Sequence, residues 1–363
     1  MQEKWIVWGT GLVGQKLYEL LVEKECVENV TAVVDSDKNK WGKSWNGFEV
    51  QDPDIIRKDV YDKIIIAVET WRGLCGQILE KYHIEPDRID NYMFIQRRAM
   101  LEFYQQKQHK PEELEKQIQY ICTHPLGVFN DDFVDKYTEL EIEVHRDEKN
   151  DMFYVLHFGK KMYFPKKFKK AEVMNYYRQI IMEQDVLSPH RYQSDEFSIK
   201  EGEVILDAGA AEGNFSLEVV DKVKSLYLVE ADEAWIEALT YTFEPYKGKV
   251  HIIQKYLTDN CNDRCITIDE LAKNETFTSI KMDIEGAEIS ALAGGEKTLR
   301  SQPLNAYICS YHRERDFDDI ANMMRHYGYN ISTTNGYMVF LSFRNLKQIP
   351  LPKLVRGVIR ASK

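Results

Sequence analysis

The amino-acid sequence predicts an α/β protein with two Rossmann-like domains. Residues 4–22 and 204–220 support this prediction, because each reads as an apolar strand, a glycine-containing turn and a helix with apolar spacing. In both cases a second strand follows and ends in an acidic residue, Asp35 or Glu230, about twenty positions after the glycines. Strands that alternate with helices in this way are typical of βαβ units and a parallel sheet.

The composition is typical of a globular protein and does not indicate binding to nucleic acid. The chain has 363 residues, of which 44% are hydrophobic, so two or three domains can each bury a core. The formal net charge of −11 argues against a general nucleic-acid-binding protein, which needs an excess of Lys and Arg. We expect neither a membrane span nor a signal peptide, since no apolar run is long enough and the first residues read as a strand. The six scattered cysteines form no C-x-x-C pair, so we expect a cytoplasmic protein without disulfides.

Changes of pattern along the chain predict four segments. They are a Rossmann-like nucleotide-binding domain, a connector of helices and a β-hairpin, a second Rossmann-like domain and a basic tail. Their expected boundaries are residues 1–96, 97–196, 197–345 and 346–363.

The N-terminal domain shows the G-x-G-x-x-G spacing of a dinucleotide-binding turn. The expected elements, in order, are strand 4–8, the turn with Gly9, Gly11 and Gly14, helix 12–22, strand 30–35, strand 63–68 and helix 71–82. Asp35 ends the second strand, where a carboxylate can accept hydrogen bonds from ribose hydroxyls. These four residues are the candidate nucleotide site of this domain.

The connector contains two features with more than one interpretation. Residues 140–145 and 153–158 alternate in polarity around a polar loop, which predicts a β-hairpin. Residues 160–170 interleave lysines with aromatic residues, which suits either contact with an anionic substrate or a solvated strand edge protected by lysines.

The basic tail also allows two interpretations. In residues 346–363, Lys353, Arg356, Arg360 and Lys363 fall near one face of a helix, and apolar residues fall near another. Such a helix would contact a membrane surface or a partner. The alternative is a solvated tail that covers the edge of the domain, since Gly357 weakens a helix.

The C-terminal domain shows a longer series of alternating elements. We expect strands at residues 204–207, 225–230, 250–254, 279–283, 305–311, 330–333 and 337–343, and helices at 232–243, 286–299 and 317–327. Sites in such sheets gather at the carboxyl ends of the strands.

The turn after the first of these strands reads DAGAAEGNFS over residues 207–216. Glycines at 209 and 213 let a ligand lie against bare backbone, and Glu230 can accept both hydroxyls of a ribose. The spacing departs from G-x-G-x-x-G, and Asp207 before the turn can hold an α-amino group. The residues therefore predict a nucleoside site, which alone would suit a dinucleotide or S-adenosylmethionine.

A second segment, residues 279–299, reads SIKMDIEGAEISALAGGEKTL and follows TIDEL at residues 267–271. Together with the turn at 207–216, these motifs closely resemble the FkbM family of S-adenosylmethionine-dependent methyltransferases, over roughly residues 184–343. The resemblance implies a doubly wound seven-stranded sheet that ends in an antiparallel hairpin. It also implies a cofactor site, formed by Asp207, Gly209, Ala210, Glu212, Gly213, Glu230 and Asp283.

The N-terminal domain, with its glycine turn and residues 35–50, resembles the nucleotide-binding domain of bacterial sugar acyltransferases. That resemblance implies a nucleotide-sugar at Gly9, Gly11, Gly14 and Asp35. Two alternatives stay open: a vestigial pocket that serves docking, and a nicotinamide site.

Methyl transfer to a hydroxyl needs a general base near the cofactor. His312 is the preferred base, because its unperturbed pKa lies near neutrality, and Asp283 is the alternative. Asp283, Glu285 and His312 are the candidate catalytic residues and could instead hold a divalent metal that orients a diol. Acids such as Glu285 and Glu288 also stabilise a helix N-terminus without any catalytic role.

The segment 183–192, EQDVLSPHRY, also resembles a stretch that precedes the core in some family members. His190 and Tyr192 would contact the substrate if this segment folds across the mouth of the site. We expect O-methylation of a sugar or sugar-derived intermediate in surface-polysaccharide assembly. The alternatives are a non-catalytic nucleotide-binding scaffold and a nicotinamide-dependent enzyme; a homo-oligomer is one option for the assembly.

Overall fold

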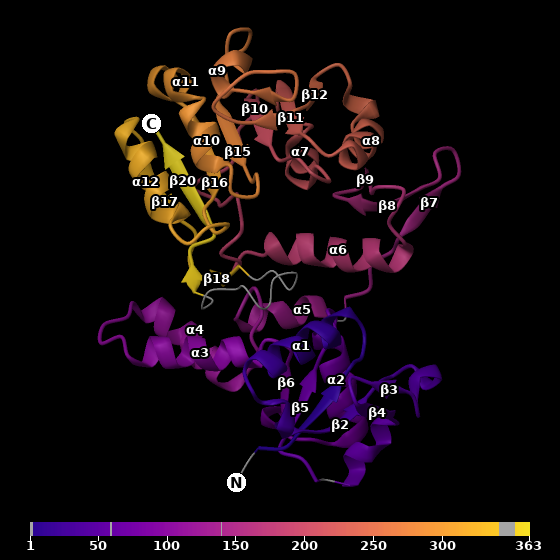
Figure 1. Ribbon diagram of the computed structural model, residues 1–363. Helices are drawn as coiled ribbons and strands as arrows, with labels where there is room; N and C mark the ends of the chain where they lie inside the picture. Colours follow the sequence, from indigo (N-terminus) through magenta and orange to yellow (C-terminus); the bar gives the residue numbers. More distant parts are fainter. Residues whose placement is uncertain (1–2, 59, 139, 341–352) are drawn as a thin grey trace. The chain divides into compact units, whose positions relative to one another are not determined.

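The computed structural model describes residues 3–58, 60–138, 140–340 and 353–363. The chain divides into two compact units (Figure 1). Unit 1 comprises Met1–Asp132 and Val339–Leu354, and unit 2 comprises Phe133–Met338 and Val355–Lys363. The expected boundaries differ from these, because residues 97–132 of the predicted connector belong to unit 1 and residues 133–196 belong to unit 2.

Unit 1 contains a six-stranded sheet in the order β3-β4-β2-β1-β5-β6. All neighbouring strands are parallel except β3 and β4, which form an antiparallel pair. The strands are β1 Trp5–Trp8, β2 Val30–Val34, β3 Ser44–Trp45, β4 Phe48–Gln51, β5 Lys63–Ile66 and β6 Ile89–Asn91. The helices are α1 Leu12–Glu23, α2 Trp71–Tyr82, α3 Phe94–Gln105 and α4 Glu112–Thr123.

The first glycine turn forms the strand-turn-helix unit that the sequence predicts. Gly9 has a φ of +115°, a backbone conformation that residues with a side chain rarely adopt. A Cβ atom on Gly14 would lie 2.1 Å from the carbonyl oxygen of Gly9, so only glycine lets α1 start this close to β1. The turn is therefore built for close packing of strand and helix.

Unit 2 contains a seven-stranded sheet in the order β12-β11-β10-β15-β16-β20-β17. Its strands are β10 Val204–Ala208, β11 Ser225–Glu230, β12 Val250–Gln254, β15 Ser279–Met282, β16 Asn305–Cys309, β17 Asn330–Thr333 and β20 Val358–Ser362. The first five form a parallel, doubly wound array, and β20 is antiparallel to both of its neighbours. The predicted fold class is thus confirmed.

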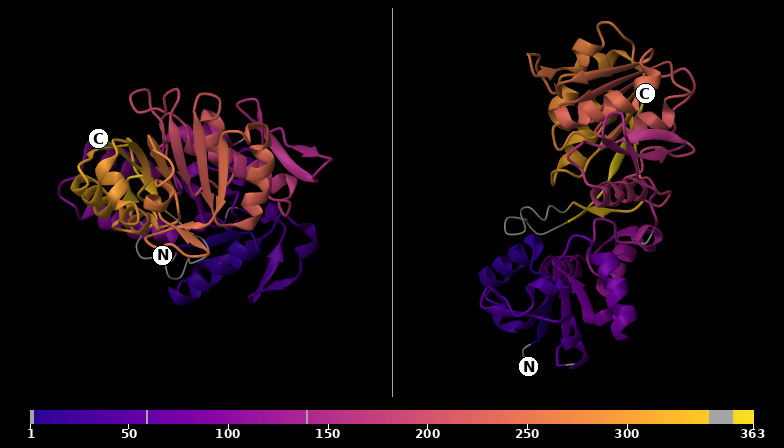
Figure 2. Two further views of the ribbon diagram at one scale, coloured as in Figure 1. Left: turned by 90° about the horizontal axis from the view of Figure 1, so that it is seen from above. Right: turned by 90° about the vertical axis from the view of Figure 1, so that its right-hand side faces the viewer.

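The strand that completes this sheet comes from the predicted basic tail. β20 pairs Ile359 with Ile308 of β16 on one side and with Thr333 of β17 on the other (Figures 1 and 2). The prediction of a helical tail for membrane or partner contact was therefore wrong for these residues. Val358 and Ile359 are β-branched and fully buried, and such residues favour a pleated strand between two packed faces.

The strand expected at residues 337–343 does not close the sheet. Its described part contributes β18, Met338–Val339, which forms a separate two-stranded sheet with β19, Leu354–Val355. Residues 341–343 lie outside the described residues.

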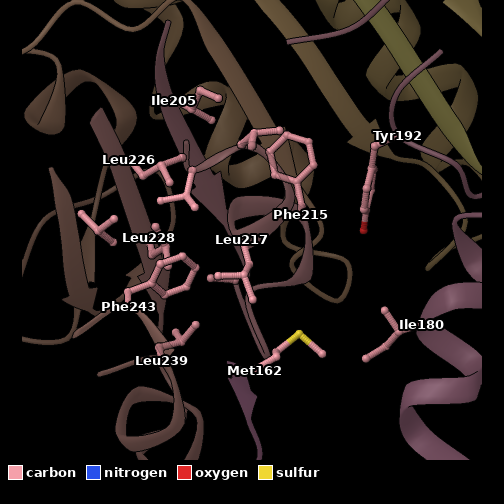
Figure 3. Close-up of a cluster of buried hydrophobic side chains, with 14 of the residues drawn as sticks. Met162, Ile180, Tyr192, Ile205, Phe215, Leu217, Leu226, Leu228, Leu239 and Phe243 are labelled. Carbon is pink, nitrogen blue, oxygen red and sulfur yellow. The ribbon is translucent and has the colours of Figure 1, made fainter. Parts of the chain in front are cut away.

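Both faces of the unit 2 sheet are buried. Along β16, Tyr307 and Cys309 join one hydrophobic cluster, whereas Ala306 and Ile308 join the other. This alternation follows from the two-residue period of a strand. Figure 3 shows the first cluster, in which Ile180 of helix α6 packs with core residues of the sheet.

The helices of unit 2 are short, and none in the described part of the chain has the length and apolarity of a membrane span. They are α5 Asp135–Thr138, α6 Lys170–Glu183, α7 Asn214–Val219, α8 Glu233–Thr242, α9 Ile268–Leu271, α10 Glu288–Ala293, α11 Glu296–Ser301 and α12 Asp316–His326. The single helix expected at 286–299 is divided at Gly294 and Gly295. A Cβ atom on Gly294 would lie 2.2 Å from the carbonyl oxygen of Thr258, so the chain bends where only glycine fits.

The predicted hairpin of the connector exists and has a third strand. β7 His145–Asp147, β8 Met152–His157 and β9 Lys160–Tyr163 form an antiparallel sheet, and β13 Tyr256–Leu257 pairs separately with β14 Cys265–Ile266. Three lysines of the cationic run form ion pairs with acidic residues, namely Lys160 with Asp221, Lys161 with Asp147 and Lys166 with Glu237. The run therefore resembles the structural alternative more than a site for an anionic substrate.

The position of β20 generates a prediction about stability. We expect Ile359→Ala to destabilise unit 2 by about 2–5 kcal/mol, because it removes a fully buried side chain between two strands. Urea unfolding followed by circular dichroism measures this change. Ser362→Ala on the same strand is the control and should have little effect; equal, small effects of both would contradict the strand assignment.

Candidate functional site

A cavity of about 190 Å³ lies at the carboxyl ends of β10 and β15 in unit 2. Five segments line it: helix α6, the segment with Tyr192, the glycine turn after β10, the end of β15 and the residues after β16. This is the edge of a doubly wound sheet at which ligands bind. Ala210, Glu212, Asp283, Glu285 and Tyr192 are the predicted site residues that line the cavity, together with Gly209.

The glycine turn lies directly against the end of β15. Gly209 has a φ of +72°, and a Cβ atom there would be 1.8 Å from the carbonyl oxygen of Asp283. Gly213 also has a positive φ, and a Cβ atom there would contact the ring of Phe243 at 2.7 Å. Both glycines are thus required by the backbone path, as the spacing predicts.

The carboxylate of Glu230 is close to the turn, as expected for a residue that reads a ribose. It accepts hydrogen bonds from the backbone N–H groups of Ala211, Ala231 and Asp232, at 3.0, 2.7 and 2.8 Å. These bonds fix the carboxylate beside the turn. Each carboxylate oxygen can accept more than one hydrogen bond, so the group retains capacity for hydroxyl donors.

Asp207 has a different environment from the one expected. Its carboxylate is completely buried, accepts a hydrogen bond from Ser216 at 2.7 Å and lies 3.1 Å from the ammonium of Lys281. Lys281 also donates to the carbonyl oxygen of Gly209 at 2.6 Å and lines the cavity. The lysine therefore lies where the predicted α-amino contact of Asp207 would be made, and Asp207 supports the turn from within the core.

The ammonium of Lys281 stays charged despite its burial. Burial by itself would lower the pKa of this lysine, but the carboxylates of Asp207 and Asp283 hold it above its ordinary value. Nothing in the motif spacing signals this residue as functional, since lysine in a strand normally faces solvent.

Asp283 is the centre of the polar network. Its carboxylate accepts hydrogen bonds from the hydroxyls of Tyr192 at 2.8 Å and Tyr311 at 3.3 Å. Burial opposes its ionisation, but the contact with His190 and the charge of Lys281 hold the pKa of this carboxyl well below its usual range. Asp283 is therefore an ionised hydrogen-bond acceptor on the cavity wall.

The segment that contains His190 and Tyr192 folds against this network, as the sequence hypothesis required. His190 is buried. Its Nε2 atom lies 3.0 Å from the hydroxyl of Tyr311 and 3.6 Å from the carboxylate of Asp283. Burial would lower the pKa of His190, but the contacts with Asp283 and Glu183 raise it. Tyr192 lines the cavity itself, whereas His190 acts on Asp283 and Tyr311.

His312 lies between two carboxylates. Its Nε2 atom is 3.3 Å from Asp283, and its Nδ1 atom is 3.0 Å from Glu288. Burial would lower the pKa of His312, but Glu288 and Asp283 raise it above the ordinary value. Because both ring nitrogens of His312 already face carboxylates, the geometry favours Asp283 over His312 as the hydrogen-bond acceptor for a substrate hydroxyl.

The two glutamates after Asp283 have different roles in the local structure. Glu288 is buried and accepts hydrogen bonds from the backbone N–H groups of Ile284 at 3.0 Å and Gly286 at 3.4 Å, so it caps the turn before α10. Glu285 is exposed and lies 3.7 Å from His312.

Among the residues that the structure describes, two groups of side chains have the composition of a metal site. The first is Asp283, Glu288 and His312, and the second is His190, Asp283 and Cys309. Glu285, which the sequence hypothesis included, belongs to neither. Because both ring nitrogens of His312 face carboxylates, ion pairing accounts for the first group without a metal.

Helix α6 forms one wall of the cavity, although the sequence assigned this segment to the connector. Tyr176 donates a hydrogen bond to Glu212 at 3.1 Å, and Glu183 lines the same cavity. Burial raises the pKa of Glu212 to about 7. The apolar spacing of α6 indicates a helix, but no local pattern indicates that it covers a site more than twenty residues downstream.

In the N-terminal candidate site, the carboxylate of Asp35 is already hydrogen-bonded within the protein, whereas the glycine turn is open at Gly11. The carboxylate of Asp35 accepts hydrogen bonds from the backbone N–H groups of Thr10 and Asp37, both at 2.9 Å, and pairs with Lys40 at 2.8 Å. These contacts engage the carboxylate that was expected to accept hydrogen bonds from a ribose. Gly11 has no atom near its missing Cβ, so the turn is open at that position.

Unit 1 also has a cavity, of about 320 Å³, which lies beside this turn. It is lined by aromatic, cationic and acidic side chains that include Trp8, Lys38, Trp41, Lys81 and Tyr82. Trp8 follows directly from β1, and Lys38 and Trp41 follow Asp35.

Two family models match the chain. Residues 1–90 match the model described as C2185-like, N-terminal, and residues 208–331 match the model of the methyltransferase FkbM domain. No curated protein sequence matches the chain. The FkbM resemblance of the C-terminal domain is therefore confirmed, and the sugar-acyltransferase resemblance of the N-terminal domain stays a prediction.

One of the similar solved structures supports the fold of the chain. The chain is similar to the methyltransferase FkbM of Methylobacillus flagellatus, with 15% identity and a TM-score of 0.53 over 99% of this chain and 90% of that one. It also matches the precorrin-6y C5,15-methyltransferase of Geobacter metallireducens, with 11% identity, a TM-score of 0.34 and 55% and 94% coverage of the two chains. The magnesium protoporphyrin IX methyltransferase of Synechocystis matches with 14% identity, a TM-score of 0.36 and 54% and 86% coverage.

The raised pKa of Glu212 predicts a pH-dependent effect on stability. The folded protein holds a proton that the unfolded chain has already released, so stability is lost as pH rises from about 4.5 to about 7. Glu212→Gln removes this loss, and we expect it to raise the melting temperature at about pH 8 more than at about pH 5. Thermal unfolding at both pH values measures the difference; Glu201→Gln at an exposed position is the control, and an equal shift at both pH values would contradict the prediction.

Proposed function

We propose, on the premise that residues 208–331 are a methyltransferase FkbM domain, that the protein transfers a methyl group from S-adenosylmethionine to an oxygen atom of an acceptor. The observation that carries this proposal is the cavity at the ends of β10 and β15, where the glycine turn, Tyr192 and the ionised Asp283 meet. A cavity with several carboxylates and one lysine suits a ligand that carries positive charge.

The residues around the cavity divide the work of holding the cofactor. Glu230 is placed for the ribose hydroxyls, and Gly209 and Ala210 leave the backbone accessible. Lys281 is placed for the carboxylate of the methionine portion, and the acidic side chains suit its amino group and sulfonium. When bound, the cofactor supplies an activated methyl group, so the protein needs only to orient the acceptor and exclude water.

Asp283 is the proposed catalytic residue that receives the acceptor hydroxyl. A sugar hydroxyl is a poor nucleophile, and a carboxylate that accepts its hydrogen bond increases the negative charge on the oxygen. Tyr192 and Tyr311 hold the carboxylate by hydrogen bonds, and His312 holds it from the other side. The two tyrosines and His312 are positioning residues in this scheme.

For the acceptor we propose a sugar or sugar-derived intermediate of surface-polysaccharide assembly. Support comes from the resemblance of residues 1–96 to nucleotide-sugar-binding domains. The cavity of unit 1 suits such a ligand, because indole and phenol rings can stack on a base and lysines can pair with phosphates.

Two other functions fit less well. A nicotinamide-dependent enzyme would need Asp35 for the ribose, but Thr10, Asp37 and Lys40 already occupy its carboxylate. A scaffold without turnover would not need an ionised Asp283 in the cavity. We also propose a reducing, cytoplasmic setting, which the six free cysteines support.

The test is transfer of a labelled methyl group from S-adenosylmethionine to a panel of nucleotide-sugars, with lipid, peptide and polyketide acceptors beside them. Transfer to a nucleotide-sugar supports the whole proposal. Transfer only to another class of acceptor would support the methyltransferase activity and contradict the proposal of a sugar acceptor. If the protein does not bind S-adenosylmethionine at all, the methyltransferase proposal fails.

The assigned roles predict different defects in two variants. Asp283→Asn should lower kcat by about 10²-fold or more with little change in cofactor affinity, because it removes the charged acceptor. Glu230→Gln should weaken cofactor binding by about tenfold, because it alters the contact to ribose. Steady-state kinetics and calorimetry separate the two effects, and Asp318→Asn on the exposed face of α12 is the control. A loss of cofactor affinity as large in Asp283→Asn as in Glu230→Gln would show that Asp283 is wrongly assigned.

A further inference from the structure

Two carboxylates of the cavity form no salt bridge with the residues that the structure describes. Glu183, at the end of α6, makes no hydrogen bond or ion pair with any residue that the structure describes, and it lines the cavity. Glu212 is 7% exposed, and its side-chain partner is the neutral hydroxyl of Tyr176.

The positive charges nearby each have contacts of their own. Lys281 pairs with Asp207 at 3.1 Å and donates to the carbonyl oxygen of Gly209. The Nε2 atom of His190 lies 3.6 Å from Asp283, and the imidazole of His312 lies between Asp283 and Glu288. The charges of His190 and Lys281 act on Glu183 and Glu212, but among the described residues neither carboxylate forms a salt bridge.

This arrangement has an electrostatic cost that a ligand can offset. Carboxylates of like charge in a partly enclosed cavity repel one another, and burial weakens their hydration. A cation in the cavity replaces the repulsion by attraction, whereas a neutral ligand of the same shape does not. The cavity is thus preorganised for positive charge.

We infer that Glu183 and Glu212 make the cavity selective for the sulfonium form of the cofactor over the neutral thioether that remains after methyl transfer. This inference rests on the proposed function. In the transfer step the bond between sulfur and the methyl carbon breaks, sulfur keeps the electron pair and becomes neutral, and the methyl carbon bonds to the acceptor oxygen. The hydroxyl proton passes to Asp283 and then to solvent.

The loss of charge on sulfur weakens the hold of both glutamates on the product. The protein would thereby release S-adenosylhomocysteine without opening the glycine turn. Glu183 and Glu212 are specificity-determining residues in this account, and they act on the ligand's charge and not on its shape.

Ligand charge is also linked to the proton on Glu212. This carboxyl is faced by Tyr176 and Glu183 from α6 and by Lys281 from β15, and burial raises its pKa to about 7. A sulfonium in the cavity favours the ionised form, so its binding expels a proton near neutral pH. The sulfur of the thioether carries no charge, so S-adenosylhomocysteine, which keeps only the α-ammonium group, should expel less.

The test compares three probes by titration calorimetry with the full-length protein near pH 6.5 to 7, the range set by the pKa of about 7. S-adenosylmethionine and its amine analogue sinefungin are cationic, and S-adenosylhomocysteine lacks that charge. We expect the two cations to bind about tenfold more tightly than the thioether. Repeating the titration in buffers of different ionisation enthalpy should show more proton release with the two cations than with the thioether.

Two variants locate the selectivity. Glu212→Gln and Glu183→Gln should each lower the preference for the cations by about three- to tenfold, with S-adenosylhomocysteine affinity changed by less than about twofold. Glu212→Gln should also abolish proton release. Glu201→Gln, at an exposed position outside the cavity, should leave every value unchanged.

The outcomes separate this inference from the proposed function. If the wild-type protein binds none of the three probes, the methyltransferase proposal fails. If it binds all three with equal affinity and equal proton release, cofactor binding stands and the charge selection is overturned. If Glu212→Gln does not fold, Glu183→Gln and the proton release of the wild-type protein decide the matter.

Discussion

The ion pair between Lys281 and Asp207 organises the site of unit 2. It joins two adjacent strands of the sheet, and the same ammonium binds the carbonyl oxygen of Gly209 in the turn. Burying two charges is unfavourable unless each finds several partners, and here Ser216 and the turn carbonyl supply them. The position of the turn against β15, and hence the shape of the cavity, depends on this contact.

A second group of charged residues, centred on Asp283, lies next to this ion pair on the cavity wall. Asp283 follows β15 directly and receives hydrogen bonds from two tyrosines that come from opposite ends of the domain sequence, Tyr192 and Tyr311. His312 connects Asp283 to Glu288, which in turn caps the loop between them. The carboxylate on the cavity wall is therefore held from several directions by groups that themselves have fixed partners, which is the usual requirement for an oriented catalytic group.

Local patterns in the sequence were sufficient for features that depend on neighbouring residues. The strand-turn-helix units, the glycines at 209 and 213 and the position of Glu230 all follow from short-range rules of backbone conformation and spacing. Features that depend on distant segments were not predictable in this way. Helix α6 covers the cavity, Lys281 faces inward, and Lys40 and the backbone N–H of Thr10 contact the carboxylate of Asp35. None of these contacts leaves a periodic signal in the sequence.

The tail is the clearest example of this limit. Its basic residues fall near one face of a helical wheel, but the sheet of unit 2 has a place for a strand between β16 and β17, and residues 358–362 occupy it. The hydrophobic energy of burying Val358, Ile359 and Ala361 on two faces outweighs any preference for a solvated helix. Intrinsic propensity is a weak guide where tertiary packing supplies the larger energy.

The insertion of β20 between β16 and β17 has a consequence for the synthesis of the protein. A ribosome produces this strand after β16, β17 and the segment of unit 1 that lies between β17 and β20. Until residues 358–362 emerge, β16 presents an unpaired edge and β17 has no partner in the sheet. Unit 2 therefore completes its sheet only when residues 358–362 have been made, whereas most of unit 1 can fold earlier in synthesis.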